Sequence, residues 1–138
     1  MRGTSRGHII AWQGGSLWIG EFNMVTGLHA HHAIQVTLAL EEHFHLRDAS
    51  TESFGDELTT AILAANRPHA LSATATVALI FLEPESTTGR VVSDLYCRAS
   101  TVSPIPLEVL GDAPVLLLQA FRRAGGKKRM ADIARQFI

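Results

Sequence analysis

The sequence contains a single cysteine, Cys97, so no disulfide can form within the chain. Structural disulfides belong to oxidising compartments, and we therefore expect a reducing, cytoplasmic location and a buried, unreactive thiol. Long apolar runs are also missing. The run at residues 8–12 ends at Gln13 after about five residues, which is too few for the apolar core of a signal peptide. No stretch approaches the ~18 apolar residues of a membrane span, so we expect no membrane association.

Net charge is nearly absent as well. The 138 residues carry a formal charge of −1, and 46% of them are hydrophobic, which is typical of one globular domain and excludes a disordered chain. The charge is unevenly placed, because residues 1–121 carry six basic and twelve acidic side chains whereas residues 122–138 carry six and one. The basic segment 122–129 could contact phosphate or could simply be a solvated helix end and loop, and it has no aromatic residues for base stacking and is too short for a DNA-binding motif. We therefore expect no sequence-specific DNA binding by this chain alone.

Short apolar runs between turn residues predict strands in the first two thirds of the chain. The expected strands are residues 8–13, 16–20, 31–40, 43–47, 58–64 and 74–82, with turns at 14–15 and 66–69. In the third strand, an apolar set (Ile34, Val36, Leu38, Leu40) alternates with a polar set (His31, Gln35, Thr37). The two sets should lie on opposite faces. Six or seven strands suit a sandwich or small barrel, with Trp12, Trp18 and Phe81 in its core or along a pocket wall.

After Glu83 the apolar period lengthens and predicts helices. Ser86 is a suitable cap for a helix that ends near Tyr96. One helical face then collects Pro114, Leu117, Leu118 and Phe121, and a second collects Met130, Ile133, Ala134 and Phe137. These faces predict a helical hairpin, whose last face would be covered by a partner or a following segment. We expect a single domain overall, in which residues 1–97 form the β part with its following helix and residues 98–138 form a linker and the hairpin.

Three histidines are placed so that they could hold a metal. His29 and His31 are two residues apart on a candidate strand, so their rings should share a face, and His69 follows a neighbouring strand. Such a half-shell suits Zn, Fe, Mn, Ni or Cu, and Gln35 could add an oxygen. Alternatively, these side chains hydrogen-bond an organic ligand or are structural. His32 has the opposite parity and should lie outside the cluster.

No catalytic residue is predicted. The sequence has no G-x-S-x-G nucleophile motif and no phosphate-binding loop, and its carboxylates are not paired at catalytic spacing. His43 and His45 share a face with Arg47, which is typical of a solvated strand face.

Three segments resemble motifs of the cupin superfamily. Residues 26–36 (TGLHAHHAIQV) resemble the first cupin motif, which pairs H-x-H with an acidic residue, and residues 66–71 (NRPHAL) resemble a shortened second motif. Together with residues 84–90 (PESTTGR), they are most similar to the N-terminal sensor domain of AraC-type transcriptional regulators, over about residues 8–124. The resemblance implies a mostly β fold, a small jelly-roll-like cupin β-barrel followed by two or three C-terminal α-helices.

The resemblance also implies a function. The barrel would bind a small-molecule effector through His29, His31, Gln35 and His69, and the metal ligands, if Zn, Fe, Mn or Ni binds, would be the three histidines. The helices would form a homodimer interface through Leu117, Leu118 and Phe121, while the DNA-binding half of such regulators has no counterpart in these residues. The alternative is a metal-dependent cupin enzyme, a small dioxygenase or isomerase. Two departures favour the sensor: the acidic position is Gln35, and the glycine expected before His69 is missing.

Overall fold

The computed structural model describes residues 2–123 and 126–137, which form a seven-stranded antiparallel sheet and helices that follow it. The strands are β1 (Arg2–Trp12), β2 (Gly15–Val25), β3 (Ile34–Glu41), β4 (Phe44–Asp48), β5 (Thr60–Leu63), β6 (His69–Leu82) and β7 (Val102–Ser103). The helices are α1 (Thr87–Tyr96), α2 (Leu107–Leu110), α3 (Ala113–Arg122) and α4 (Lys127–Phe137). The expected fold class, mostly β with C-terminal helices, is confirmed.

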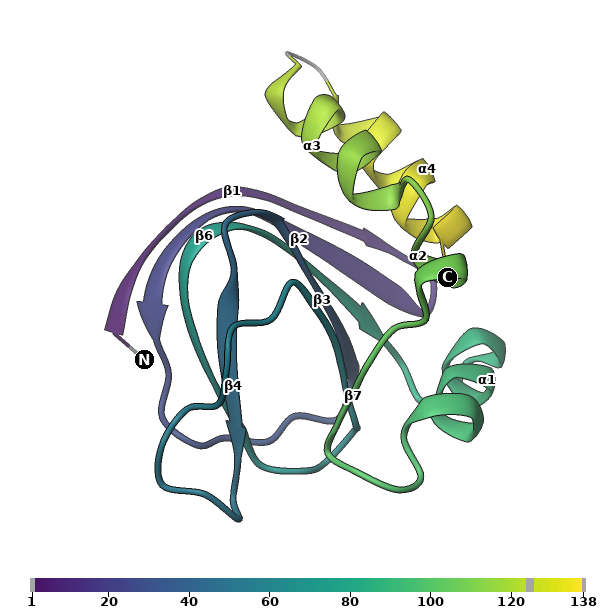
Figure 1. Ribbon diagram of the computed structural model, residues 1–138. Coiled ribbons are helices and arrows are strands. Elements are labelled where there is room, and N and C mark those ends of the chain that lie inside the picture. The colour runs from purple at the N-terminus through teal and green to yellow at the C-terminus, as the bar shows by residue number, and fades with distance from the viewer. Residues whose placement is uncertain (1, 124–125, 138) are drawn as a thin grey trace.

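The long strand β6 is the centre of the sheet. The strand order is β1-β2-β6-β3-β5-β7, and β4 pairs with the first residues of β6. The sheet curls strongly around one side of the molecule (Figure 1). It nevertheless stays open, because no ladder within residues 2–123 joins the edge strands β1 and β7. The structure therefore differs from the expected barrel in lacking closure.

Both faces of this sheet are apolar. The outer face carries Leu17 and Ile19 of β2 and Ile34, Val36 and Leu38 of β3, all at most 2% exposed. The inner face carries a second cluster with Phe22, Met24, Phe44, Leu63, Leu71 and Leu79. Because neighbours cover both faces, β3 is buried at five consecutive positions, as two-sided strands are. The predicted alternation in β3 is confirmed, since Gln35 and Thr37 lie on the face opposite Ile34, Val36 and Leu38.

Helices α3 and α4 cover the outer face of the sheet (Figure 1). Leu117 of α3 and Ala134 of α4 have no exposed surface, and Met130 is 1% exposed in the same cluster. An ion pair between Arg122 and Glu41 joins α3 to the end of β3. The chain's own sheet thus covers most of the apolar face for which the sequence predicted a partner or a following segment.

Replacing Leu117 by alanine should destabilise the chain by about 2–5 kcal/mol, because a completely buried leucine leaves a cavity. The matched control is Val115→Ala on the same helix, where the side chain is 58% exposed and the change should stay within about 0.5 kcal/mol. Urea unfolding measures both. Equal, small effects in the two variants would show that Leu117 does not belong to the core.

Leu117, predicted at a homodimer interface, has no surface to offer a second copy in this structure. Leu118 and Phe121 are partly buried, and Phe121 packs edge-on against His8 of β1 at 6.0 Å. A homodimer that uses Leu118 and Phe121 stays a prediction.

Several boundaries differ from the expected ones. β1 begins at Arg2 rather than at residue 8, and β6 begins at His69, where a turn was expected. The two-residue strand β7 and the single-turn helix α2 were not predicted, because elements this short carry no periodicity. In the basic segment 122–129, residues 124 and 125 lie outside the described residues. None of the described helices has the length and apolar content needed to cross a membrane.

Candidate metal centre and ligand pocket

The two cupin-like motifs meet through a short backbone pairing. The His29 amide donates to the His69 carbonyl at 3.0 Å, and the His69 amide donates back to the His29 carbonyl at 2.9 Å. His29 and His31 therefore lie in the loop before β3, whereas the sequence pattern had predicted a strand for them. The pairing still sets them beside the first residue of β6.

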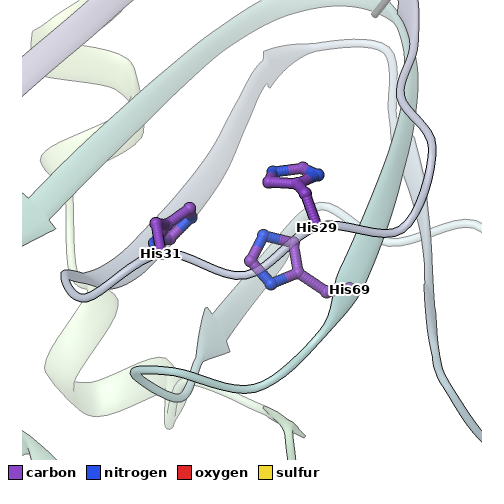
Figure 2. A group of neighbouring side chains, drawn as sticks. All are labelled: His29, His31 and His69. Carbon is purple, nitrogen blue, oxygen red and sulfur yellow. The ribbon is translucent and has the colours of Figure 1, made fainter.

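The rings of His29, His31 and His69 gather into one cluster, as predicted (Figure 2). Ring centroids lie 4.7 Å apart for His29 and His69 and 4.8 Å apart for His31 and His69. One nitrogen from each ring lies within 4.8 Å of the other two. We call these three residues the histidine cluster.

Each ring of the histidine cluster has its Nδ1 bonded to a backbone carbonyl two residues away. The distances are 3.0 Å from His29 to Gly27, 2.9 Å from His31 to Ala33, and 3.2 Å from His69 to Arg67. A neutral histidine that donates from Nδ1 keeps its lone pair on Nε2. Metal-binding histidines are oriented by such bonds, so all three rings have the tautomer needed to ligate through Nε2.

His69 is the buried member of the cluster. Burial lowers the pKa of its ring to about 4, and the neighbouring rings of His31 and His29 add to this, while the bond to Arg67 acts in the opposite direction. The ring is therefore neutral near pH 7. Its Nε2 is buried and has no hydrogen-bond partner among the described residues. Because an unpaired buried acceptor costs about 1–3 kcal/mol, the site favours a metal ion or a ligand donor at this atom.

The cluster fits a transition metal with a small adjustment. Zinc binds imidazole nitrogen at about 2.0–2.1 Å, so three ligating nitrogens lie about 3.4 Å apart in a tetrahedral site. The nitrogens here are somewhat farther apart, within 4.8 Å. His29 is the exposed member and lies in a loop, so we expect the adjustment to fall on its ring and on the Gly27 segment to which it is bonded.

Gln35, predicted as an additional ligand, lies beside the histidine cluster. Its side chain is buried, its Oε1 lies 3.1 Å from Nε2 of His31, and its Nε2 donates to Oγ1 of Thr37 at 3.0 Å. Two acceptors thus face each other across 3.1 Å. A cation or a second proton between them satisfies both atoms, as does a half-turn of the amide that presents its NH2 group.

The histidine cluster opens into a cavity of about 410 Å3 on the inner face of the sheet, which we call the histidine pocket. Its polar lining consists of Ser16, Thr26, His29, His31, Gln35 and His69. Its apolar lining consists of Trp18, Phe22, Met24, Ala33, Leu71, Leu79 and Phe81. The four side chains predicted to bind a ligand therefore share one cavity, of a size that lies within the ~300–1,000 Å3 of small-molecule sites.

The pocket walls include two of the predicted core or wall candidates and other residues that the sequence did not place there. Trp18, expected in the core or along a pocket wall, is 41% exposed and lines the pocket, with Phe81 edge-on at 5.4 Å. Trp12 and Phe81 are partly buried against the hydrophobic clusters, close to expectation. Met24 and Leu71 also line the pocket. The sequence alone could not show this, because it depends on which strands are neighbours in the sheet.

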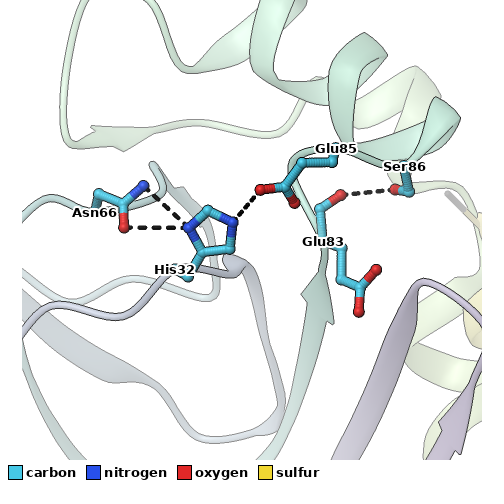
Figure 3. Close-up of polar contacts among 5 residues, drawn as sticks. All are labelled: His32, Asn66, Glu83, Glu85 and Ser86. Carbon is cyan, nitrogen blue, oxygen red and sulfur yellow. Dashed lines mark hydrogen bonds and ion pairs between the residues drawn. The ribbon is translucent and has the colours of Figure 1, made fainter.

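His32 does not belong to the histidine cluster, as its parity predicted, and its ring lies between Asn66 and Glu85 (Figure 3). Its Nε2 makes a short contact with Oε1 of Glu85, and its Nδ1 lies 3.4 Å from the side chain of Asn66. The bond to Glu85 raises the pKa of His32, and a backbone hydrogen bond, together with the bond to His32, lowers the pKa of Glu85. This exposed pair ties the histidine-bearing loop to the turn between β6 and α1.

These contacts explain the structural role of residues 84–90 (PESTTGR). Glu85 bonds His32, and Oγ of Ser86 accepts the Gly89 amide at 2.9 Å as the predicted cap of α1. Gly89 approaches the backbone so closely that a Cβ would lie 1.9 Å from the Glu83 carbonyl oxygen. The motif therefore shapes the corner that supports the loop of His29 and His31.

The remaining candidate groups lie outside the pocket. His43 and His45 are side by side at 5.5 Å and partly exposed, with His43 3.3 Å from Glu57. Burial raises the pKa of the Cys97 thiol, which keeps it protonated and unreactive near pH 7.

Two solved structures show a distant likeness to this chain. No protein-family model matches the sequence, and none of the curated proteins does. The structure of protein NMB1881 from Neisseria meningitidis is similar with a TM-score of 0.46 and 20% identity, over 56% of this chain and 82% of that one. An RmlC-like cupin from Shewanella frigidimarina is similar with a TM-score of 0.35 and 14% identity, over 64% and 99%. At this level of identity and overlap, these likenesses say nothing about what the chain binds.

Proposed function

We propose that this chain is a cupin-type, small-molecule-binding domain in which the histidine cluster holds a divalent transition metal at the end of the histidine pocket. The observation that carries the proposal is the convergence of three Nδ1-anchored imidazoles, one of which has a buried and unpaired Nε2. The H-x-H and P-H motifs that resemble the cupin superfamily supply these same residues. We further propose that the domain senses an effector, as the similarity to AraC-type sensors implies.

In this proposal, His29, His31 and His69 hold the ion through Nε2, with Gln35 as a possible oxygen donor. Imidazole ligands suit Zn, Fe and Ni, whereas Mn would rely more on oxygen ligands. The ion would act as a Lewis acid toward a ligand oxygen or nitrogen. The protein's own contribution is to set the tautomers through the backbone carbonyls of Gly27, Ala33 and Arg67 and to shield one side with apolar residues.

Binding without conversion is favoured by the lining of the pocket. Apart from imidazoles and the hydroxyls of Ser16 and Thr26, the described lining residues include no acid or base: no Asp, Glu, Lys, Arg, Tyr or Cys. Histidine is the commonest group in proton-transfer catalysis, but in this proposal the three imidazoles hold the metal and are not available to transfer protons.

A metal-dependent oxidation needs no acid or base from the protein. We therefore keep the dioxygenase alternative, which the exposure of His29 also favours because a substrate could reach the ion. Oxygen uptake by the Fe(II)-loaded chain with candidate aromatic and polyol compounds would support it.

Titrating Zn2+ into metal-free protein by calorimetry tests the metal site. We expect about one ion per chain, and the double variant His29→Ala/His31→Ala should weaken binding at least about 100-fold, since even losing outer-shell partners costs 10–100-fold. The matched control is His43→Ala/His45→Ala, which removes the other pair of adjacent histidines. Equal losses in both double variants, or none, would overturn the proposal.

A homodimer and the absence of sequence-specific DNA binding by the chain alone remain proposals. Sedimentation equilibrium at tens of micromolar tests the first, and a monomer would overturn it. Binding to randomised DNA duplexes tests the second, and selection of one sequence would overturn it.

A further inference from the structure

The walls of the histidine pocket are aromatic and uncharged. Trp18 of β2 and Phe81 of β6 stand edge-on at 5.4 Å with an interplanar angle of 66°, and Phe81 in turn stands 5.5 Å from the ring of His31. Trp18, Phe81 and His31 therefore form a continuous row of rings along the pocket wall. Leu79 and Leu71 add aliphatic surface to the inner side.

Trp18 remains 41% exposed, and so does its partner on β1, Ile9, at 62%, whereas Leu79, opposite Trp18 on β6, is buried. Exposed apolar area beside a cavity marks a place where a ligand can gain from burial. Trp18 and Phe81 offer ring faces and edges, which favour a flat aromatic partner over a puckered one of equal size.

The other end of the pocket lacks negative charge. Gln35 is neutral where a carboxylate would balance a cation, and the described lining residues include no Asp or Glu. A divalent ion on three neutral imidazoles would keep its full charge beside the buried side chains of His69 and Gln35, where an uncompensated charge is costly. A ligand that brings one anionic oxygen would supply the missing charge.

We propose that the histidine pocket binds a small, flat aromatic molecule that carries a single anionic oxygen, as in an aryl carboxylate or a phenolate. Its ring would lie along Trp18 and Phe81, and its oxygen would face the histidine cluster. The cavity of about 410 Å3 has room for one or two fused rings. The inference rests on the proposed metal-binding function, because the cation supplies the positive charge.

Calorimetry on the Zn2+-loaded chain tests this inference with four probes. Benzoate and 4-nitrophenolate, both anionic in mildly alkaline buffer, carry both features, cyclohexanecarboxylate keeps the anionic oxygen without the flat ring, and benzamide keeps the ring without the charge. We expect at least one of the first two to bind about tenfold more tightly than both of the others. Which of the two binds better separates carboxylate from phenolate.

The variant Trp18→Ala should weaken binding of the preferred probe about tenfold while leaving Zn2+ affinity unchanged. The matched control Trp12→Phe alters the chain's other tryptophan, which lies outside the histidine pocket, and should change neither. Normal Zn2+ binding without preference for the aromatic anions would overturn this inference and leave the metal site standing. Failure to bind Zn2+ would overturn the metal site itself.

Discussion

Replacing His69 by leucine should abolish metal binding without weakening the metal-free fold. Leucine has a similar volume and removes a buried ring nitrogen that has no partner among the described residues. The free energy of unfolding of the metal-free protein should therefore stay the same or rise by about 1 kcal/mol. The affinity for Zn2+ should fall at least about 100-fold, because one of three ligands is lost. Urea unfolding and calorimetry measure the two effects.

Loss of Zn2+ affinity without loss of stability distinguishes a metal-binding histidine from a structural one. The lost bond from Nδ1 to the Arg67 carbonyl is replaced by water, because Arg67 is exposed. His45→Leu, at a partly exposed position on β4, is the control and should keep its Zn2+ affinity. A His69→Leu variant that loses several kcal/mol of stability and still binds Zn2+ normally would show that the ring is only part of the core.

Converting Gln35 to glutamate should change stability and metal affinity in opposite directions. The side chain is 3% exposed, so a carboxylate there is buried in the metal-free protein and should cost about 1–3 kcal/mol of stability. With Zn2+ bound, the same carboxylate neutralises the ion, and affinity should rise at least about tenfold. Thermal unfolding measures both effects. Compared with the unaltered chain, the variant should have a lower Tm without Zn2+ and a larger rise in Tm when Zn2+ is added.

Gln119→Glu on the exposed side of α3 is the matched control, because it adds the same charge far from any proposed ligand. It should alter neither stability nor affinity appreciably. A Gln35→Glu variant with unchanged or weaker Zn2+ binding would place Gln35 outside the coordination sphere.

Local patterns in the sequence predicted the parts of the fold that depend on neighbouring residues. The alternation in β3 placed Gln35 and Ile34 on opposite faces, and Ser86 caps α1 as expected. Spacing of the two motifs also predicted that His29, His31 and His69 would meet. The first two features follow from periodicity and capping, which act over a few residues, whereas the meeting of His69 with His29 and His31 was predicted from the resemblance of two distant segments to the cupin motifs.

Features that depend on strand order could not be predicted in the same way. Trp18 faces the pocket because β2 pairs with β6, and His32 meets Glu85 across the fold. The start of β6 at His69 depends on its pairing with β4 and with the loop at His29, which overrides the turn propensity of the preceding proline. Likewise, an amphipathic helix does not reveal whether its own sheet or a second copy covers it, and here its own sheet covers Leu117.

The most direct test of a metal centre in the histidine cluster is a crystal structure of the Zn2+-loaded chain, with diffraction recorded at the zinc absorption edge. We expect one strong anomalous peak per chain, about 2.0–2.1 Å from Nε2 of His29, His31 and His69. The absence of a peak at this position under saturating Zn2+, or a peak only at other histidines such as His43 and His45, would contradict it.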